Sequence, residues 1–177
     1  LSNIEIATQW EEIRQDNLKR SGDRAAKRAA QIEAELSAMG RLAADLGRRT
    51  SSGEIFPDSN LNAAAMEIVA IPLSDLRALG GAELGLNDLI QFYDSSFYKE
   101  LPFVRNEAEL MARLVTGNEE IRPSDVMDVR SIAAFLPYCS HMVIDRAQIE
   151  AVTSLGLDID YGCRVLRLLE VEEVLQL

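Results

Sequence analysis

Apolar residues recur at helical spacing along most of the chain. Between 23 and 46 they stand at steps of three, four and seven and predict one long helix, at Ala25, Ala29, Ile32, Leu36, Met39 and Leu46. Residues 1–20 predict a short extended entry followed by a helix. Shorter helices are expected over four further segments, 61–69, 73–79, 86–93 and 107–115. The polar stretch 47–60 contains glycine and proline, which favour a loop.

The last third of the chain changes character and predicts strands. Pro123 and Ser124 begin a helix, which Pro137 ends. Four further elements are expected here, a strand over 141–145, a helix over 146–155, a strand over 163–168 and a helix over 170–177. A strand, a helix and a strand at this spacing form a βαβ unit, whose strands are parallel. The predicted fold is therefore a helix-rich α/β domain over 1–177, with a parallel sheet flanked by helices.

Two aspartates that are far apart in the sequence are expected at one edge of this unit. Asp128 lies in the first turns of its helix, which then descends roughly 13 Å at ~1.5 Å per residue. The strand that ends at Asp145 climbs back over about the same length at ~3.3 Å per residue. Asp125 lies one helical turn before Asp128 and faces roughly the same way. Because ligands of α/β folds bind at the carboxyl ends of parallel strands, this edge is a candidate site.

Carboxylates that share one edge raise each other's pKa unless a cation lies between them. Oxygen ligands suit Mg²⁺ or Mn²⁺, which can polarise a phosphate oxygen and generate hydroxide. One interpretation is phosphodiester hydrolysis at Asp128 and Asp145, with Asp125 in support, although spacing alone favours a structural role for these acids. Arg130 and Arg146 lie beside these acids and could hold the phosphate or form salt bridges. The alternative is structural, because aspartates also suit helix N-termini and caps.

Composition narrows the class of protein. The chain has 177 residues, of which 47% are apolar, enough for a core and too many for a disordered tail. No apolar run approaches the ~18–20 residues of a membrane span, so we expect no membrane partner. Two cysteines and one histidine argue against zinc and favour a reducing cytoplasm. The chain begins at Leu1 within an apolar pattern, so we expect it to be a fragment whose upstream part is missing.

Charge is unevenly distributed along the chain. The formal net charge is −11, and residues 51–177 carry the excess of acids. Such an acidic body repels nucleic acid, so binding would need a bridging metal or a local basic stripe. The long helix offers a stripe, with Arg20, Arg24, Lys27 and Arg28 on one side. Neighbouring acids favour a self-paired, solvated face over a nucleic-acid contact at this stripe.

The candidate site residues lie in a segment that resembles the C-terminal half of PIN-like domains. From Ser124 to Asp145, a helix-starting aspartate is followed by Leu-Pro-Tyr-Cys and by a strand that ends in aspartate. Phe97–Phe103 and Tyr161–Leu166 are also similar to a bacterial branch of this family. The resemblance covers about 90–168.

PIN-like domains are metal-dependent nucleases, mostly of RNA and often toxins, with three or four acids around Mg²⁺ or Mn²⁺. The resemblance assigns Asp128 to the family's acid at the helix start and Asp145 to its acid at the strand end. The family's first acid lies on a first strand that this sequence lacks. Its second acid would fall at Thr8, so Glu12 or Glu5 would have to take that place.

Three functional hypotheses follow. The first is a Mg²⁺- or Mn²⁺-dependent, toxin-like endoribonuclease that cuts single-stranded RNA through Asp128 and Asp145, with Asp125 and Glu12 in support. The second is a non-catalytic module that docks a protein partner through the apolar side of the helix over 23–46. The third is a regulatory subunit, similar in role to an antitoxin, that binds a basic partner through its acidic body.

Overall fold

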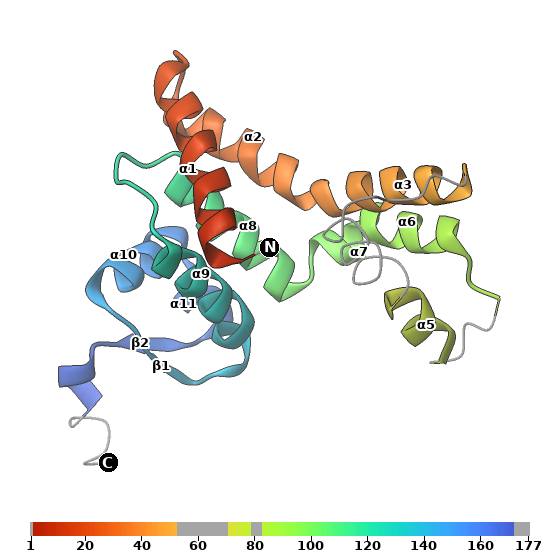
Figure 1. Ribbon diagram of the computed structural model, residues 1–177. Helices are drawn as coiled ribbons and strands as arrows, with labels where there is room; N and C mark the ends of the chain where they lie inside the picture. Colours follow the sequence, from red (N-terminus) through yellow and green to blue (C-terminus); the bar gives the residue numbers. More distant parts are fainter. Residues whose placement is uncertain (1, 53–70, 79–82, 172–177) are drawn as a thin grey trace. The chain divides into compact units, whose positions relative to one another are not determined.

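The computed structural model describes residues 2–52, 71–78 and 83–171. Where the sequence predicts one domain, the contacts divide the chain into two compact units. The first unit is formed by Leu1–Ile32 and Pro102–Leu177, and the second by Glu33–Leu101 (Figure 1). All of the predicted site residues fall in the first unit, which therefore carries the candidate site.

Helices make up most of the first unit. They are α1 (Asn3–Lys19), the start of α2 (Arg24–Leu36), α8 (Pro102–Val115), α9 (Pro123–Phe135), α10 (Arg146–Leu155) and α11 (Leu157–Tyr161). Ser2 and Glu5 form a reciprocal capping box, in which each side chain accepts a hydrogen bond from the other residue's amide. This cap starts α1 at Asn3, and Ser2, whose backbone is extended, is the described part of the predicted extended entry.

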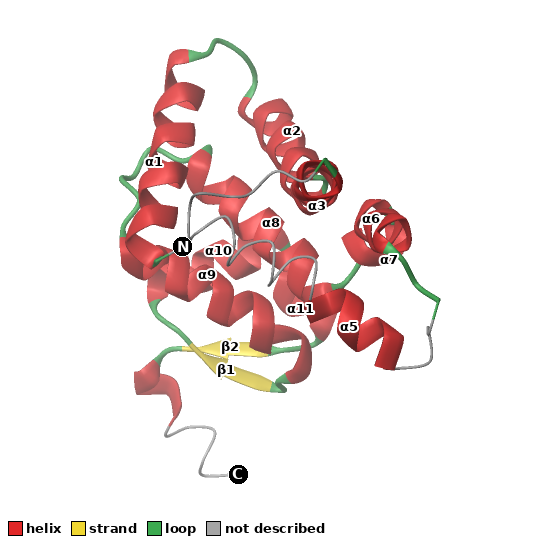
Figure 2. Ribbon diagram, turned by 45° about the vertical axis from the view of Figure 1, so that its right-hand side comes forward, coloured by secondary structure: helices red, strands yellow, loops and turns green. Residues whose placement is uncertain are grey.

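The two strands confirm the predicted parallel pairing. β1 (His141–Val143) and β2 (Arg164–Leu166) run side by side in one direction, with Met142 opposite Val165 (Figure 2). Helices α10 and α11 connect them, so the expected order of strand, helix and strand is present. Both strands are shorter than predicted. The helix-rich α/β class is therefore confirmed with a sheet of two strands among the described residues.

One hydrophobic core holds the first unit together. Its buried side chains come from α1, α8, α9, α10, α11, the 3₁₀ turn η2 (Leu136–Tyr138) and the segments beside them; they are Ile6, Ala7, Trp10, Leu110, Met111, Val115, Ile121, Val126, Val129, Ile132, Leu136, Val152, Leu157 and Cys163. Each large side chain contributes roughly 1.5–3 kcal/mol on burial. The core therefore fixes α9 and the segment after β1, which carry Asp128 and Asp145.

The second unit is a small helical assembly. It contains the end of α2, α3 (Ala38–Ser51), α5 (Ile71–Ala78), α6 (Leu86–Asp94) and α7 (Ser96–Lys99). Ala43, Leu89 and Tyr93 form its buried centre. α3 approaches α6 closely because it presents a glycine there: a Cβ on Gly40 would lie 2.0 Å from Asp94 Oδ1. A side chain at this position would displace the Asp94 carboxylate.

The long helix predicted over 23–46 is divided. Ser37 is a turn residue between α2 and α3, although helical backbone hydrogen bonds continue through it. α3 also runs on to Ser51, beyond the predicted end. Part of the apolar stripe that was expected to dock a partner is covered, since Leu46 is buried and Met39 packs against the buried centre of the second unit.

The remaining helices mostly agree with the pattern. Those predicted over 73–79, 86–93 and 107–115 are present as α5, α6 and α8. The predicted helix over 61–69 lies outside the described residues, as do most of the loop over 47–60 and most of the final helix, where a 3₁₀ turn η3 (Leu168–Glu170) is present. No helix within the described ranges is long and apolar enough to span a membrane.

Candidate metal centre

The segment after β1 leads directly into a helix cap. Asp145 is the N-cap of α10, and its Oδ1 accepts a hydrogen bond of 2.9 Å from the Gln148 amide. In return, Gln148 Oε1 accepts a hydrogen bond of 3.1 Å from the Asp145 amide. This capping box satisfies two backbone donors at the helix start. The structural role that the sequence allows for Asp145 is therefore present, and it engages one oxygen of an exposed carboxylate.

Asp128, on the second turn of α9, is close to this cap. Burial raises the pKa of its carboxyl group, and a hydrogen bond with the Gln148 side chain partly opposes that rise. The negative charges of Asp145 and Asp125 raise the same pKa further. Gln148 thus contacts both Asp128 and the Asp145 backbone. The structure brings Asp145 and Asp125 near enough to Asp128 for their charges to act on its carboxyl group.

This arrangement suits a metal site whose shell is completed by water or phosphate. It does not suit a site in which protein side chains supply every ligand. Asp125 Oδ2 accepts a hydrogen bond of 2.7 Å from the Arg122 amide, so this acid also caps its own helix. Among the residues that the structure describes, no three His, Cys, Asp or Glu side chains are grouped to hold a metal ion. Mg²⁺ often takes only one or two protein carboxylates and completes its shell with water and phosphate oxygens. Asp128 and Asp145 supply that number of carboxylates.

The two arginines expected beside these acids have different surroundings. Arg130 Nε lies 3.2 Å from Glu107 Oε1 and joins α9 to α8, so its charge serves a salt bridge. Arg146 is the first residue of α10, directly after Asp145, and is exposed. It forms no ion pair or side-chain hydrogen bond with the described part of the chain. Arg146 is therefore the better placed of the two to meet a phosphate.

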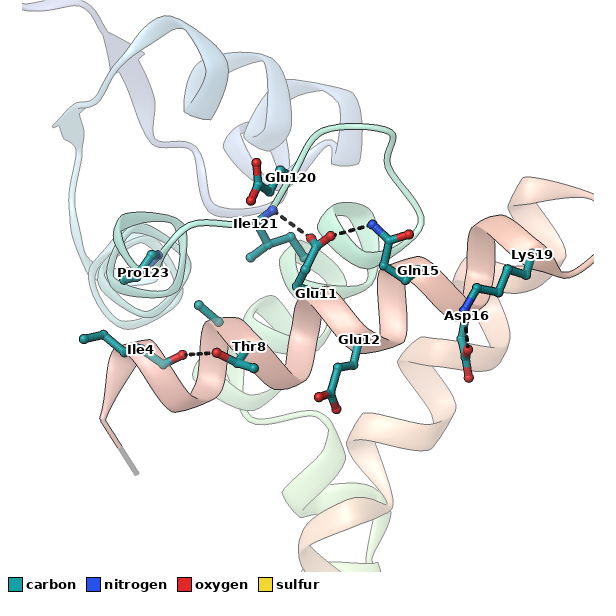
Figure 3. A pocket seen from close by; sticks show the side chains of 11 residues that line it. Ile4, Thr8, Glu11, Glu12, Gln15, Asp16, Lys19, Glu120, Ile121 and Pro123 are labelled. Atoms are coloured by element: carbon teal, nitrogen blue, oxygen red, sulfur yellow. Dashed lines mark hydrogen bonds and ion pairs between the residues drawn. The ribbon is translucent and has the colours of Figure 1, made fainter.

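Glu12 is not brought to this edge. It lines a separate cleft of about 430 Å³ along α1, together with Asp16 and Glu120 (Figure 3). It is also absent from the groups that shift the pKa of Asp128. Glu5, the other substitute for the missing family acid, is engaged by Ser2, whose hydrogen bonds lower the pKa of the Glu5 carboxyl group.

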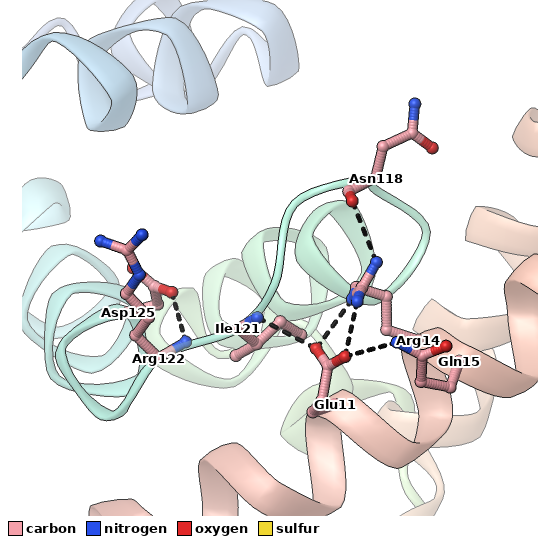
Figure 4. A network of polar contacts seen from close by, with 7 residues as sticks. All are labelled: Glu11, Arg14, Gln15, Asn118, Ile121, Arg122 and Asp125. Carbon is pink, nitrogen blue, oxygen red and sulfur yellow. Dashed lines mark hydrogen bonds and ion pairs between the residues drawn. The ribbon is translucent and has the colours of Figure 1, made fainter.

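A different carboxylate on α1, that of Glu11, is surrounded by donors (Figure 4). Arg14 donates from Nε at 2.8 Å and from Nη2 at 2.5 Å. The Ile121 amide donates at 3.0 Å and the Gln15 side chain at 2.8 Å. The hydrogen bond with Arg14 is the main reason that the pKa of Glu11 is lowered to about 2. Arg14 Nη1 also donates to Asn118 O at 3.0 Å, so the network ties α1 to the loop between α8 and α9.

Sequence reasoning missed Gln148 and Glu11. Gln148 stands three residues after Asp145, which is the spacing of a capping box, so the cap could have been found. Glu11 stands three residues before Arg14, a common spacing for helical ion pairs. Nothing in the sequence marks Ile121 as the further partner of Glu11, because 110 residues separate them.

Comparisons with known proteins do not identify the chain. It matches no protein-family model, no curated protein and no solved structure. Support for a site therefore comes from the geometry and charges of these residues. The assignment to PIN-like domains has the sequence resemblance as its only support.

Proposed function

We propose that this chain forms a PIN-like domain of a Mg²⁺- or Mn²⁺-dependent endoribonuclease, toxin-like in type, that cuts single-stranded RNA in the cytoplasm. The observation that carries the proposal is the surroundings of Asp128, where burial and repulsion by the charges of Asp145 and Asp125 raise the pKa, close to the end of a strand of a parallel pair. None of the three forms an ion pair with a lysine or arginine in the described residues. A divalent cation would relieve that repulsion.

Each residue of the edge has a distinct role in this proposal. Asp128 and Asp145 would hold the ion, Asp125 would orient a water molecule beside them, and Arg146 would contact the phosphate. The ion, when bound, would polarise the phosphate and lower the pKa of a water molecule. Gln148 holds the relative positions of the two ligands, because it bonds the backbone of one and the carboxylate of the other.

Two residues named from the sequence have no role in the proposal. Arg130 forms an ion pair with Glu107, and this contact explains why a charged side chain stands at this position. Glu12 lines the cleft along α1, and the groups that shift the pKa of Asp128 do not include it. The proposed site is therefore smaller than the one that the family resemblance implies.

Cleavage of a fluorescent single-stranded RNA with Mn²⁺ tests the proposal. We expect Asp128→Asn to lower the cleavage rate at least about a hundredfold, because a metal ion contributes several kcal/mol and 1.4 kcal/mol is tenfold. The matched control is Asp160→Asn on α11, which removes the same charge from an exposed position. Undiminished cleavage by Asp128→Asn, with EDTA-sensitive cleavage by the wild type, would refute the assignment.

A non-catalytic interaction module is the second candidate. The lack, within the described ranges, of a group of three metal-binding side chains favours it. Its docking surface would differ from the predicted stripe, because Met39 and Ala43 are packed inside the second unit. A regulatory subunit that binds a basic partner is one form of this candidate. A wild-type protein that neither cuts RNA nor binds Mn²⁺ would support it.

A further inference from the structure

A polar cleft of about 470 Å³ lies in the first unit between the start of α2, the end of α8 and α10. Three arginines line it, Arg24 and Arg28 from α2 and Arg113 from α8. The loop after α8 adds Gly117, which lies beside the guanidinium group of Arg24. A Cβ on this glycine would lie 3.7 Å from Arg24 Nη2. Side chains that are distant in sequence thus converge on one cationic wall.

Two of these arginines lack an acidic partner. Neither Arg24 nor Arg28 forms an ion pair or a side-chain hydrogen bond with the described residues. The Nε–H group of Arg28 is also shielded from solvent and unbonded, which is costly for a polar group. In a chain of net charge −11, acidic partners are abundant. Two unpaired cations in one cleft therefore indicate an anionic ligand.

Contacts on both sides hold this cationic wall in place. Arg113 Nε donates to Ser154 Oγ at 3.1 Å, and its Nη2 lies 3.5 Å from Glu150 Oε1, so it is anchored on α10. Lys27 Nζ donates to Asn17 O at 2.6 Å and fixes the start of α2 against the end of α1. Lys27 belongs to the basic stripe predicted from the sequence, and the structure gives it this anchoring role.

Acidic residues also line the cleft and decide which anion fits. Glu119 and Glu120 are exposed on the loop, Glu150 is engaged by Arg113, and Asp125 caps α9. A compact, multiply charged anion would be repelled by these carboxylates. A phosphodiester backbone carries one charge per phosphate and presents oxygens that guanidinium groups bind in pairs, so it can follow the arginines.

The cleft continues towards the proposed metal centre. A small cavity of about 50 Å³ is lined by Asp128 together with Asp125 and Arg113, and the last two also line the arginine cleft. A strand whose scissile phosphate lies at Asp128 would therefore have its neighbouring phosphates near Arg113, Arg24 and Arg28.

We propose that this cleft binds the phosphodiester backbone of single-stranded RNA beside the scissile bond, with Arg24 and Arg28 as the phosphate contacts. The proposal rests on the proposed function, because that function makes single-stranded RNA the ligand and places its scissile phosphate at Asp128. Arg24 and Arg28 bind substrate and take no part in the cleavage step. They differ from Arg20, which belongs to the same predicted stripe and does not line the cleft.

Fluorescence anisotropy with a short labelled oligouridylate in EDTA tests this inference on the full 177-residue chain. We expect R24Q/R28Q to weaken binding at least about tenfold. The slope of log K against log salt should shrink by about 1.4, since each phosphate contact on a single strand contributes about 0.7. The control R20Q/R164Q removes the same charge from exposed positions outside the cleft, and its affinity should stay within about twofold.

Equal weakening in both double variants, or no binding by the wild type, would overturn the inference. Because Arg24 and Arg28 lack partners, the melting temperature of R24Q/R28Q should match that of the wild type, and R24E/R28E should abolish binding. Failure of the two proposals is distinguishable. RNA binding that depends on the arginines without any metal-dependent cleavage overturns only the nuclease. Cleavage that depends on Asp128, with RNA binding insensitive to the arginines, overturns only the cleft.

Discussion

Two carboxylates of the first unit respond to their surroundings in opposite ways. Glu11 accepts hydrogen bonds from several donors, chiefly Arg14, and its pKa falls to about 2. Asp128 is partly buried beside two further aspartates, and its pKa rises. The fold itself stabilises the charged form of Glu11, whereas burial and like charges destabilise the charged form of Asp128.

This difference separates a structural acid from a functional candidate. The Glu11 network is complete, since the carboxylate, the buried Arg14 and the Ile121 amide all have partners. A ligand would add nothing to it. At Asp128 like charges are left together, and such perturbed groups cluster at binding and catalytic sites. Variants of Glu11 should therefore change stability, and variants of Asp128 should change metal binding and cleavage.

The largest stability effect is expected from Glu11→Gln. It should lower the free energy of unfolding by about 2–3 kcal/mol, because Arg14 is 5% exposed and would lose its charged partner. Chemical denaturation at neutral pH measures the change. The neighbouring control Glu12→Gln should change stability by less than about 0.5 kcal/mol, as at other exposed sites. Equal effects at the two positions would contradict the structural role of Glu11.

The two acids should also give opposite pH dependences. The folded pKa of Glu11, about 2, lies below its ordinary 4.5, so its stabilisation is complete above pH 4.5 and is lost as the pH falls towards 2. The folded pKa of Asp128 lies above its ordinary 3.8, so its contribution is present below pH 3.8 and is lost as the pH rises through the folded value.

Denaturant titrations at a series of pH values measure both effects. Below pH 4.5 the wild type should lose up to about 3 kcal/mol through Glu11, and Glu11→Gln should lack this loss. Asp128→Asn should remove the opposite dependence and raise stability at neutral pH. An acid loss that persists in Glu11→Gln would assign it to other carboxylates.

Much of this first unit follows from sequence patterns that are local. The parallel pair was predictable because two short apolar segments flank a helix at βαβ spacing. The nearness of Asp128 to Asp145 follows from matched helix and strand lengths. The capped start of α1 was not predicted, although Ser2 and Glu5 have the spacing of a capping box.

Long-range features could not be read from the pattern. The arginine cleft depends on Arg24 and Arg113 meeting across 89 positions of the chain, which no periodicity encodes. The division of the long helix at Ser37 was equally hidden, because helical hydrogen bonds pass through the turn and the apolar spacing is unbroken. Packing of Ala43 within the second unit, rather than helix propensity, determines which face of that segment is buried.

A smaller effect is expected from Gln148→Ala, which removes the side chain between the two aspartates. Loss of half of the capping box should lower stability by about 0.5–1 kcal/mol. Loss of the hydrogen bond to Asp128 should raise the pKa of that carboxyl group further, since this bond opposes the effect of burial. Carbon-detected NMR titration of the aspartate carboxyl groups measures the shift. An unchanged Asp128 pKa would contradict the bridging role of Gln148.

The smallest effect is expected from Arg130→Gln. Its salt bridge with Glu107 is partly exposed, so the change in stability should be at most about 1 kcal/mol. The rate of RNA cleavage should not change, because the charge of Arg130 serves the contact between α8 and α9. A large loss of cleavage in a variant with the wild-type melting temperature would return Arg130 to the set of phosphate contacts.

Paramagnetic broadening by Mn²⁺ tests the central claim most directly, because it locates the ion without requiring turnover. In amide NMR spectra of the wild-type chain, substoichiometric Mn²⁺ should broaden signals from 125–129 and 145–148 first, and Asp128→Asn should remove this selectivity. Broadening centred instead on the acidic cleft around Glu12 and Asp16, or unchanged by Asp128→Asn, would contradict the account.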